Sequence, residues 1–152
     1  MNEGKRPGGL TALAIINFIL AGFGVLSLFG MVAWFGLIDK VPTEQMNETQ
    51  KAQIEAVQNM GMPTLVLLLV LTLLSCALLL LSGIGYLKQK KVLGRVVGNI
   101  YAISSIVGSI ISGLLFATEL GGGFNFGTII GLIYPVLTLA LINTTFKDDL
   151  TN

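Results

Sequence analysis

The stretch MPTLVLLLVLTLLSCALLLLSGIGYL, residues 62–87, contains no charged residue and consists mainly of leucine and other apolar residues. A helix needs about 20 such residues to cross the hydrocarbon core of a bilayer, and this run is longer. A helix also satisfies its own backbone hydrogen bonds, which is a requirement inside lipid. Residues 62–87 are therefore predicted to form a transmembrane helix.

Uncharged stretches at residues 10–38, 96–118 and 120–146 also exceed the spanning length. The last begins with LGGGFNFG, a poor helix-forming sequence, so its helix is predicted to start near residue 125. The predicted spans are 10–38, 62–87, 96–118 and 125–146. The predicted fold is all-α, a four-helix transmembrane bundle that forms a single integral membrane domain.

The composition agrees with this fold and excludes several kinds of site. Hydrophobic residues make up 53% of the chain and charged residues only 11%, whereas soluble domains carry about 25% charged residues. The chain has no histidine, so it offers no imidazole ligand or imidazole base. Cys76 is the single cysteine, so an intrachain disulfide is impossible. We expect neither a metal ion nor a cofactor.

Basic residues are unevenly divided between the two sides that four alternating spans create. Lysine and arginine next to transmembrane spans remain on the cytoplasmic side. Seven of the nine basic residues fall on one side: Lys5, Arg6, Lys88, Lys90, Lys91, Arg95 and Lys147. Only Lys40 and Lys51 fall on the other. Both termini are therefore predicted to be cytoplasmic.

The densest group of basic residues lies in YLKQKKVLGR, residues 86–95, where a cytoplasmic loop is predicted at 88–95. Lys88, Lys90, Lys91 and Arg95 have two compatible interpretations. They determine topology, or they bind headgroups of anionic lipids with about 1 kcal/mol per basic residue. The loop is short and lacks aromatic residues for base stacking, so nucleic acid is not an expected partner.

Residues 39–61 form the outer loop, and a short amphipathic helix is predicted within it. Thr43 is a candidate N-cap, and Gly61 followed by Pro63 is a stop signal. The helix would lie on the outer membrane surface or over the mouth of the bundle. It is either a solvated connector or a binding site for a partner.

Small residues recur at helical spacing in the third and fourth spans. They are Gly94, Gly98, Ala102, Ser105, Ser109 and Gly113, followed by Gly123, Gly127 and Gly131. In lipid, small residues let helix backbones approach each other closely. The stripes therefore indicate packing inside the bundle, or else self-association or docking to another membrane protein. The leucine-rich second span is expected to be the helix most exposed to lipid.

Pro135 interrupts the fourth span. It lacks a backbone donor and crowds the carbonyl of Gly131, so a kink is predicted there, either as a static bend or as a gating hinge. Asn17, Asn99 and Thr138 are the polar residues predicted to form hydrogen bonds between helices.

No ionisable residue lies inside a span, and Glu119, just past the third, comes nearest. The chain therefore has no evident proton relay and is expected not to be an enzyme. The favoured function is an accessory, scaffolding or sensory membrane subunit that packs through its small-residue faces. Its expected partners are membrane lipids and either itself or another membrane protein. The alternative is a small channel or facilitator for a neutral solute, because Ser104, Ser105, Ser109 and Ser112 form a weakly polar face.

The segments RPGGLTALAIINFILAGFGVLSL, residues 6–28, and LIYPVLTLALINTTFKDDL, residues 132–150, resemble small four-span proteins of bacterial inner membranes. The likeness covers the first and fourth spans and the basic GR entry to the third. It implies a location in the bacterial inner membrane. It transfers no catalytic or ligand-binding residue to this chain.

Overall fold

The computed structural model describes residues 7–37, 40, 42, 46–59, 62–120 and 126–150. At 111–120 and 126–130, and at 53, 56, 57, 62 and 65, only the backbone is described. The helices are α1 (Gly8–Leu37), α2 (Glu48–Asn59), α3 (Met62–Leu87), the π-helix η2 (Lys91–Val96), α4 (Val97–Leu120) and α5 (Phe126–Asn143). The described residues contain no strand, so this part of the chain is all-helical.

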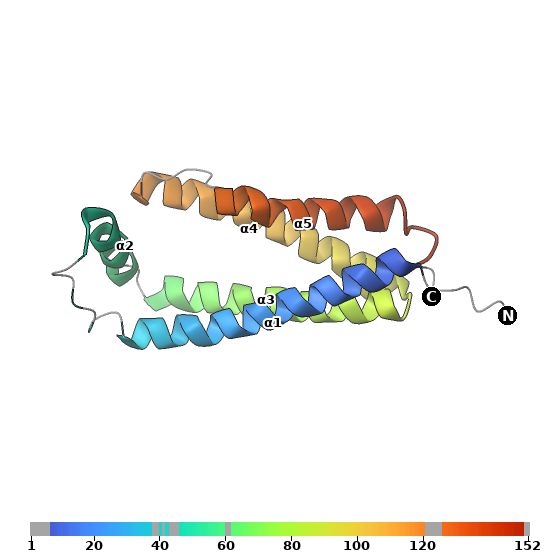
Figure 1. Ribbon diagram of the computed structural model, residues 1–152, viewed down its shortest axis with the longest axis horizontal. Coiled ribbons are helices and arrows are strands. Elements are labelled where there is room, and N and C mark those ends of the chain that lie inside the picture. The colour runs from blue at the N-terminus through green and yellow to red at the C-terminus, as the bar shows by residue number, and fades with distance from the viewer. Residues whose placement is uncertain are drawn as a thin grey trace.

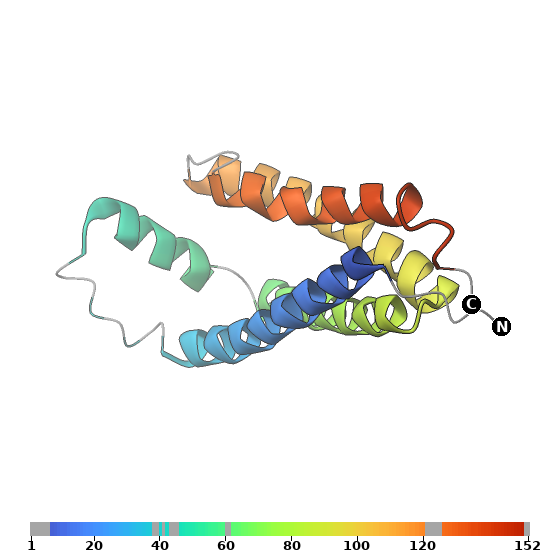
Figure 2. The same cartoon turned by 45° about the vertical axis from the view of Figure 1, so that its right-hand side comes forward.

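The long helices form two antiparallel pairs, α1 with α3 and α4 with α5 (Figures 1 and 2). In the first pair, Asn17 lies beside Ser82 and Gly24 beside Cys76. The two pairs meet at the end where α1 begins and α5 ends, and they lie apart near α2. We call the end where the pairs meet the basic end, because it carries Lys88, Lys90, Lys91, Arg95 and Lys147.

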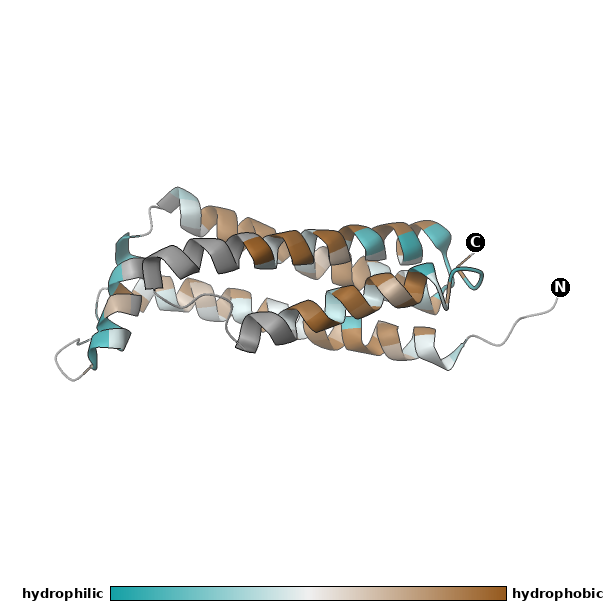
Figure 3. Cartoon of the chain, turned by 90° about the horizontal axis from the view of Figure 1, so that it is seen from above, coloured by the Kyte–Doolittle hydropathy of each residue, from teal (hydrophilic) through white to brown (hydrophobic). Residues whose placement is uncertain are grey.

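Among the described residues, three helical segments are long and apolar enough to cross a membrane: Gly8–Leu37, Val66–Leu87 and Lys91–Ile110. A shorter apolar segment, Gly131–Asn143, lies in α5. In the most apolar window of each long segment only 22% of the residues are buried, so most apolar side chains face outward. Soluble proteins rarely expose apolar surface on this scale, whereas lipid covers it. Figure 3 shows hydrophobic residues along the middle of the long helices and hydrophilic residues mainly at the two ends.

The buried core lies in the half of the molecule next to the basic end. Its two clusters share Tyr134 at their border. The first contains Leu10, Leu13, Ala14, Tyr86, Ile142, Phe146 and Leu150, and the second contains Ala21, Leu79, Tyr101 and Ala102. Phe146 and Leu150 follow α5 in the chain; Phe146 packs beside Gly9 of α1 and Leu150 beside Gly94 of η2, so the C-terminal segment closes this core.

The connection between α3 and η2 is tighter than the loop predicted at 88–95. The Lys90 amide donates to the Gly85 carbonyl at 2.9 Å and the Gln89 amide to the Tyr86 carbonyl at 3.4 Å. With Gln89 at a φ of 51°, these bonds form a Schellman motif that ends α3. A Cβ atom on Gly85 would overlap the backbone of Gly94. The two backbones therefore touch, and Lys91 and Arg95 belong to a helix.

The helix in the outer loop is present as α2, at the end opposite the basic end (Figure 1). Its N-cap is Asn47: the Gln50 amide donates to Asn47 Oδ1 at 2.8 Å, and the Asn47 amide donates to Gln50 Oε1 at 3.2 Å. This reciprocal pair is a capping box. Thr43, the cap suggested by the sequence, lies outside the described residues.

The expectation that the leucine-rich second span is the most lipid-exposed helix is wrong. The apolar windows of α1, α3 and the η2–α4 segment are buried to the same share, 22%. Moreover, α3 contacts α1, η2 and α4, so it lies at the junction of the two pairs. Its small residues near the basic end, Ser82, Gly83 and Gly85, are all buried there.

Candidate functional site: two polar clusters and a basic end

Three polar side chains from three helices meet in the core. The Asn17 amide of α1 donates from Nδ2 to Ser82 Oγ of α3 at 2.7 Å. The Tyr134 hydroxyl of α5 donates to Asn17 Oδ1 and lies 3.4 Å from the Leu13 carbonyl oxygen. Ser82 in turn donates to the Leu79 carbonyl at 3.1 Å. We call Asn17, Ser82 and Tyr134 the core cluster; it joins α1, α3 and α5.

Two further hydroxyl groups are buried next to the core cluster. Tyr86 and Thr138 are both 0% exposed. The Tyr86 hydroxyl faces Ser82, and the Thr138 hydroxyl faces Tyr134. Within the described part of the chain, neither oxygen reaches hydrogen-bonding geometry with any partner. A buried hydroxyl without a partner costs about 1–3 kcal/mol, so this region holds unused hydrogen-bonding capacity.

A second cluster joins α4, α5 and η2 near the basic end. Asn143 Nδ2 donates to Asn99 Oδ1 at 2.6 Å, and Asn99 Nδ2 donates to Asn143 Oδ1 at 3.2 Å. Arg95 Nε also donates to Asn143 Oδ1 at 3.3 Å. We call Arg95, Asn99 and Asn143 the amide cluster. The prediction of interhelical hydrogen bonds is confirmed for Asn17 and Asn99 but does not hold for Thr138.

The small residues predicted to pack helices have different surroundings. Gly94, Gly98 and Ala102 are buried, and a Cβ atom on Gly98 would overlap the Tyr86 hydroxyl. Ser105 and Ser109 are half-buried. Gly131 is exposed, and no described atom lies within 4 Å of an added Cβ atom. The surroundings of Gly113, Gly123 and Gly127 lie outside the described part of the chain.

Pro135 is buried inside α5, directly after Tyr134 of the core cluster, and the helix continues through it to Asn143.

The structure describes the side chains of only some residues of the predicted serine face. Ser104 is exposed and donates to its own helix, at the Tyr101 carbonyl, at 2.9 Å. The side chains of Ser112 and Glu119 are not among those described.

The side chains of Lys88, Lys90, Lys91 and Lys147 are exposed at the basic end, and Arg95 is half-buried. Among the residues that the structure describes, the one ion pair joins Lys51 and Glu48 of α2, 3.8 Å apart, at the opposite end. The cations of the basic end therefore have no carboxylate partner in the described chain, although Asp148 and Asp149 lie at the same end.

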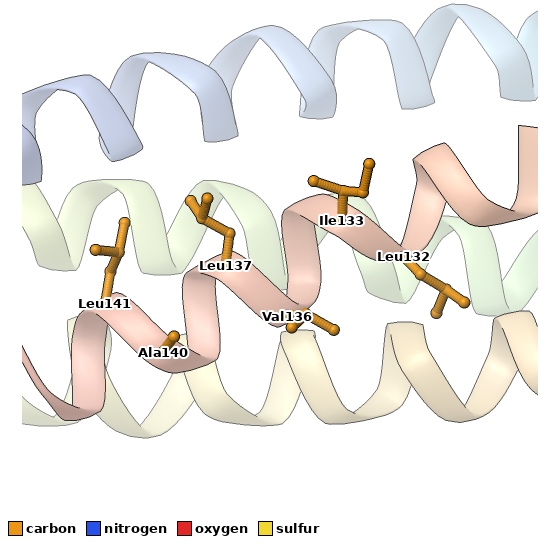
Figure 4. Close-up of a pocket in the computed structure, with 6 residues that line it drawn as sticks. All are labelled: Leu132, Ile133, Val136, Leu137, Ala140 and Leu141. Atoms are coloured by element: carbon orange, nitrogen blue, oxygen red, sulfur yellow. The ribbon is translucent and has the colours of Figure 1, made fainter.

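An open apolar groove of about 510 Å³ runs along the outward face of α5 (Figure 4). Its lining residues are Leu132, Ile133, Val136, Leu137, Ala140 and Leu141. Ile133, Leu137 and Leu141 follow one edge, whereas Leu132 and Val136 follow the other. The groove ends two residues before Asn143 of the amide cluster.

These sites can bind and position, but they offer little covalent chemistry. Across the described residues, no three Cys, Asp or Glu side chains gather in a way that could hold a metal ion. Cys76, at 4% exposed, is buried against Gly24 of α1 and is not disulfide-bonded. The core cluster contains neutral hydroxyl and amide groups, which suit hydrogen bonding to neutral polar molecules or between helices.

Sequence reasoning did not identify Ser82, Tyr134 or Asn143 as members of these clusters. Serine and tyrosine are common in apolar spans, so their type alone is a weak signal. Asn143 was a stronger signal, because an amide next to an apolar run must find a hydrogen-bonding partner if it is buried.

In comparisons with known proteins, no family model, no curated protein and no solved structure matches this chain.

Proposed function

We propose that this chain is a non-enzymatic protein of the bacterial inner membrane, a four-helix transmembrane bundle that serves as an accessory, scaffolding or sensory subunit. In this proposal both termini are cytoplasmic, since seven of the nine basic residues then face the cytoplasm. The 18 residues of α5 extend about 27 Å, close to the hydrocarbon thickness of about 30 Å.

The observation that carries the proposal is an unpartnered seam on the outward face of α1. Exposed residues recur along the sequence at intervals of four and three residues in turn, the spacing found in helices that pack side by side. They are Ile15, Ile19, Gly22, Leu26, Phe29, Ala33 and Gly36. We call this set the α1 seam.

The glycines of the α1 seam pack against nothing in the described part of the chain. Nothing lies within 4 Å of a Cβ atom added to Gly22 or Gly36. Glycine in a helix interior is less stable than alanine by about 1 kcal/mol, so a contact outside the chain would explain these positions. Beside them, Leu26 and Phe29 are 66% and 71% exposed. Small residues next to large apolar ones fit the close approach of a partner helix.

Cross-linking in native membranes tests this function. In a Cys76→Ser background, Ala33→Cys carries a photoactivatable cross-linker into the α1 seam. We expect an adduct of defined mass, either a dimer or a complex with one partner, which Gly22→Ile abolishes and Gly108→Ile preserves. Gly108 is the control because it is an exposed, uncontacted glycine on α4. If Ala33→Cys gives only monomer, the subunit function is contradicted.

A small facilitator for a neutral solute is the second candidate, and the unused hydroxyls of Tyr86 and Thr138 favour it. Both are buried in the core, where a neutral polar solute could supply the missing hydrogen bonds. Flux of glycerol and urea into liposomes that contain the purified protein tests it, with empty liposomes as the baseline. Equal flux in both would remove this candidate. Flux that Thr138→Val lowers would support it.

A further inference from the structure

We propose that the α5 groove and the adjoining Arg95 bind one anionic phospholipid, with an acyl chain in the groove and the phosphate at the guanidinium group. The groove supplies an apolar channel on the membrane-facing side of α5. The amide cluster lies at its end and holds the arginine in place. This site is independent of the α1 seam, which belongs to a different helix.

The length of the groove fits a lipid of one leaflet. From Leu132 to Leu141 the helix rises about 14 Å. Half of a hydrocarbon core of about 30 Å is about 15 Å, the depth that one acyl chain occupies. Ala140 leaves room along this path because its side chain is a single methyl group, whereas Val136 and Leu137 form walls that are 53% and 45% exposed.

Arg95 is positioned for a phosphate group. Its Nε donates to Asn143 Oδ1 at 3.3 Å, which fixes the guanidinium group beside the end of α5. Its two terminal nitrogen atoms make no hydrogen bond or ion pair within the described residues. A guanidinium group has five donors in a planar fork, which suits bidentate contact with phosphate oxygens. The Arg95 side chain is half-buried, so it is less hydrated than the side chains of the exposed lysines.

The charge around this arginine favours an anionic lipid over a zwitterionic one. Among the described residues, the basic end has five cations, Lys88, Lys90, Lys91, Arg95 and Lys147, against two carboxylates, Asp148 and Asp149. None of these groups forms an ion pair in the described part of the chain. Basic pockets between transmembrane helices at a membrane surface are typical sites for anionic headgroups.

Native mass spectrometry of the full-length protein, delipidated in detergent, tests the site. The probes are dioleoyl phosphatidylglycerol, dioleoyl phosphatidylcholine and glycerophosphoglycerol, the headgroup without acyl chains. We expect one phosphatidylglycerol per chain, bound about tenfold more tightly than phosphatidylcholine, because the excess of cations at the basic end attracts a headgroup with net negative charge and repels the choline ammonium group. Glycerophosphoglycerol should not be retained, since it lacks the acyl chain that fills the groove.

Two substitutions, each with a matched control, locate the lipid. Arg95→Gln keeps a donor for Asn143 and should weaken binding about tenfold, whereas Lys88→Gln, at an exposed position, should change it less than about fivefold. Ala140→Phe fills the groove without altering charge, and it should abolish the preferential binding of phosphatidylglycerol. Ala77→Phe, at an exposed position on α3, should not.

Three outcomes would overturn the proposal. Equal losses from Arg95→Gln and Lys88→Gln would indicate diffuse attraction to anionic lipid instead of a site. Unchanged binding to Ala140→Phe would place the acyl chain elsewhere. Equal retention of phosphatidylcholine and phosphatidylglycerol would contradict the preference of the site for an anionic lipid.

Discussion

The side-chain amide of Asn17 in α1 donates a hydrogen bond of 2.7 Å to the hydroxyl of Ser82 in α3, and both side chains are 0% exposed. The same amide accepts a hydrogen bond from Tyr134 of α5. In an apolar core these groups have no competing water, so one residue fixes the mutual position of three helices. Asn17 is therefore the central residue of the fold near the basic end.

Replacing Asn17 by leucine should lower the free energy of unfolding by about 1–2 kcal/mol, since two interhelical hydrogen bonds are lost. Unfolding in mixed micelles measures the change. Ser75→Ala is the control, because Ser75 donates only to its own helix, at the Leu71 carbonyl, at 2.9 Å. Ser75→Ala should change the free energy of unfolding by no more than about 0.5 kcal/mol. An Asn17→Leu protein with wild-type stability would show that the core cluster does not hold the helices together.

Replacing Thr138 by valine should leave the protein as stable as the wild type or more stable, by up to about 1 kcal/mol. The substitution keeps the side-chain shape and removes a buried hydroxyl that has no partner. The same unfolding measurement applies, and Ser82→Ala is the opposite control because its hydroxyl is bonded on both sides. If Thr138→Val destabilises the protein, a bound molecule satisfies this hydroxyl in the membrane.

Gly24→Cys should form an intrachain disulfide with Cys76 on mild oxidation. A Cβ atom at position 24 would overlap Cys76 Sγ, so the two sulfur atoms can meet after a small rotation. Mass spectrometry after alkylation reads out the bond without ambiguity, because the wild type has one cysteine. Gly22→Cys is the matched control, since Gly22 faces away from α3. Equal yields of the disulfide from Gly24→Cys and Gly22→Cys would contradict the α1–α3 register.

The sequence alone was sufficient to predict the helices but not their neighbours. Uncharged runs indicated where helices form, and α3 matches the predicted span 62–87. Asn17 and Asn99 were identifiable because an amide in an apolar span needs a partner. Ser82 and Tyr134 were not, since which spans adjoin depends on three-dimensional packing. The exposure of α3 was misjudged because its small residues, though few, lie where the two helix pairs meet.

Gly85→Ala should lower the free energy of unfolding by about 2 kcal/mol. The added methyl group would overlap the backbone of Gly94 in η2, and a helix backbone cannot move aside as a flexible side chain can. Gly108→Ala is the control, because nothing lies within 4 Å of its added Cβ atom. Thermal unfolding in detergent compares the two. Equal melting temperatures would mean that α3 and η2 are further apart in the membrane.

A double-mutant cycle on Asn99 and Asn143 should give a coupling energy of about 1 kcal/mol, because the two amides bond to each other in both directions. Asn143→Ala alone should cost more than Asn99→Ala, since it also removes the acceptor for Arg95 Nε. The control cycle pairs Asn17 with Asn99, which belong to different clusters and should therefore be additive within about 0.5 kcal/mol. Additivity in the Asn99–Asn143 cycle would show that the amide pair does not join α4 to α5. It would also leave the Arg95 guanidinium group without the fixed neighbour that a phosphate site at this end requires.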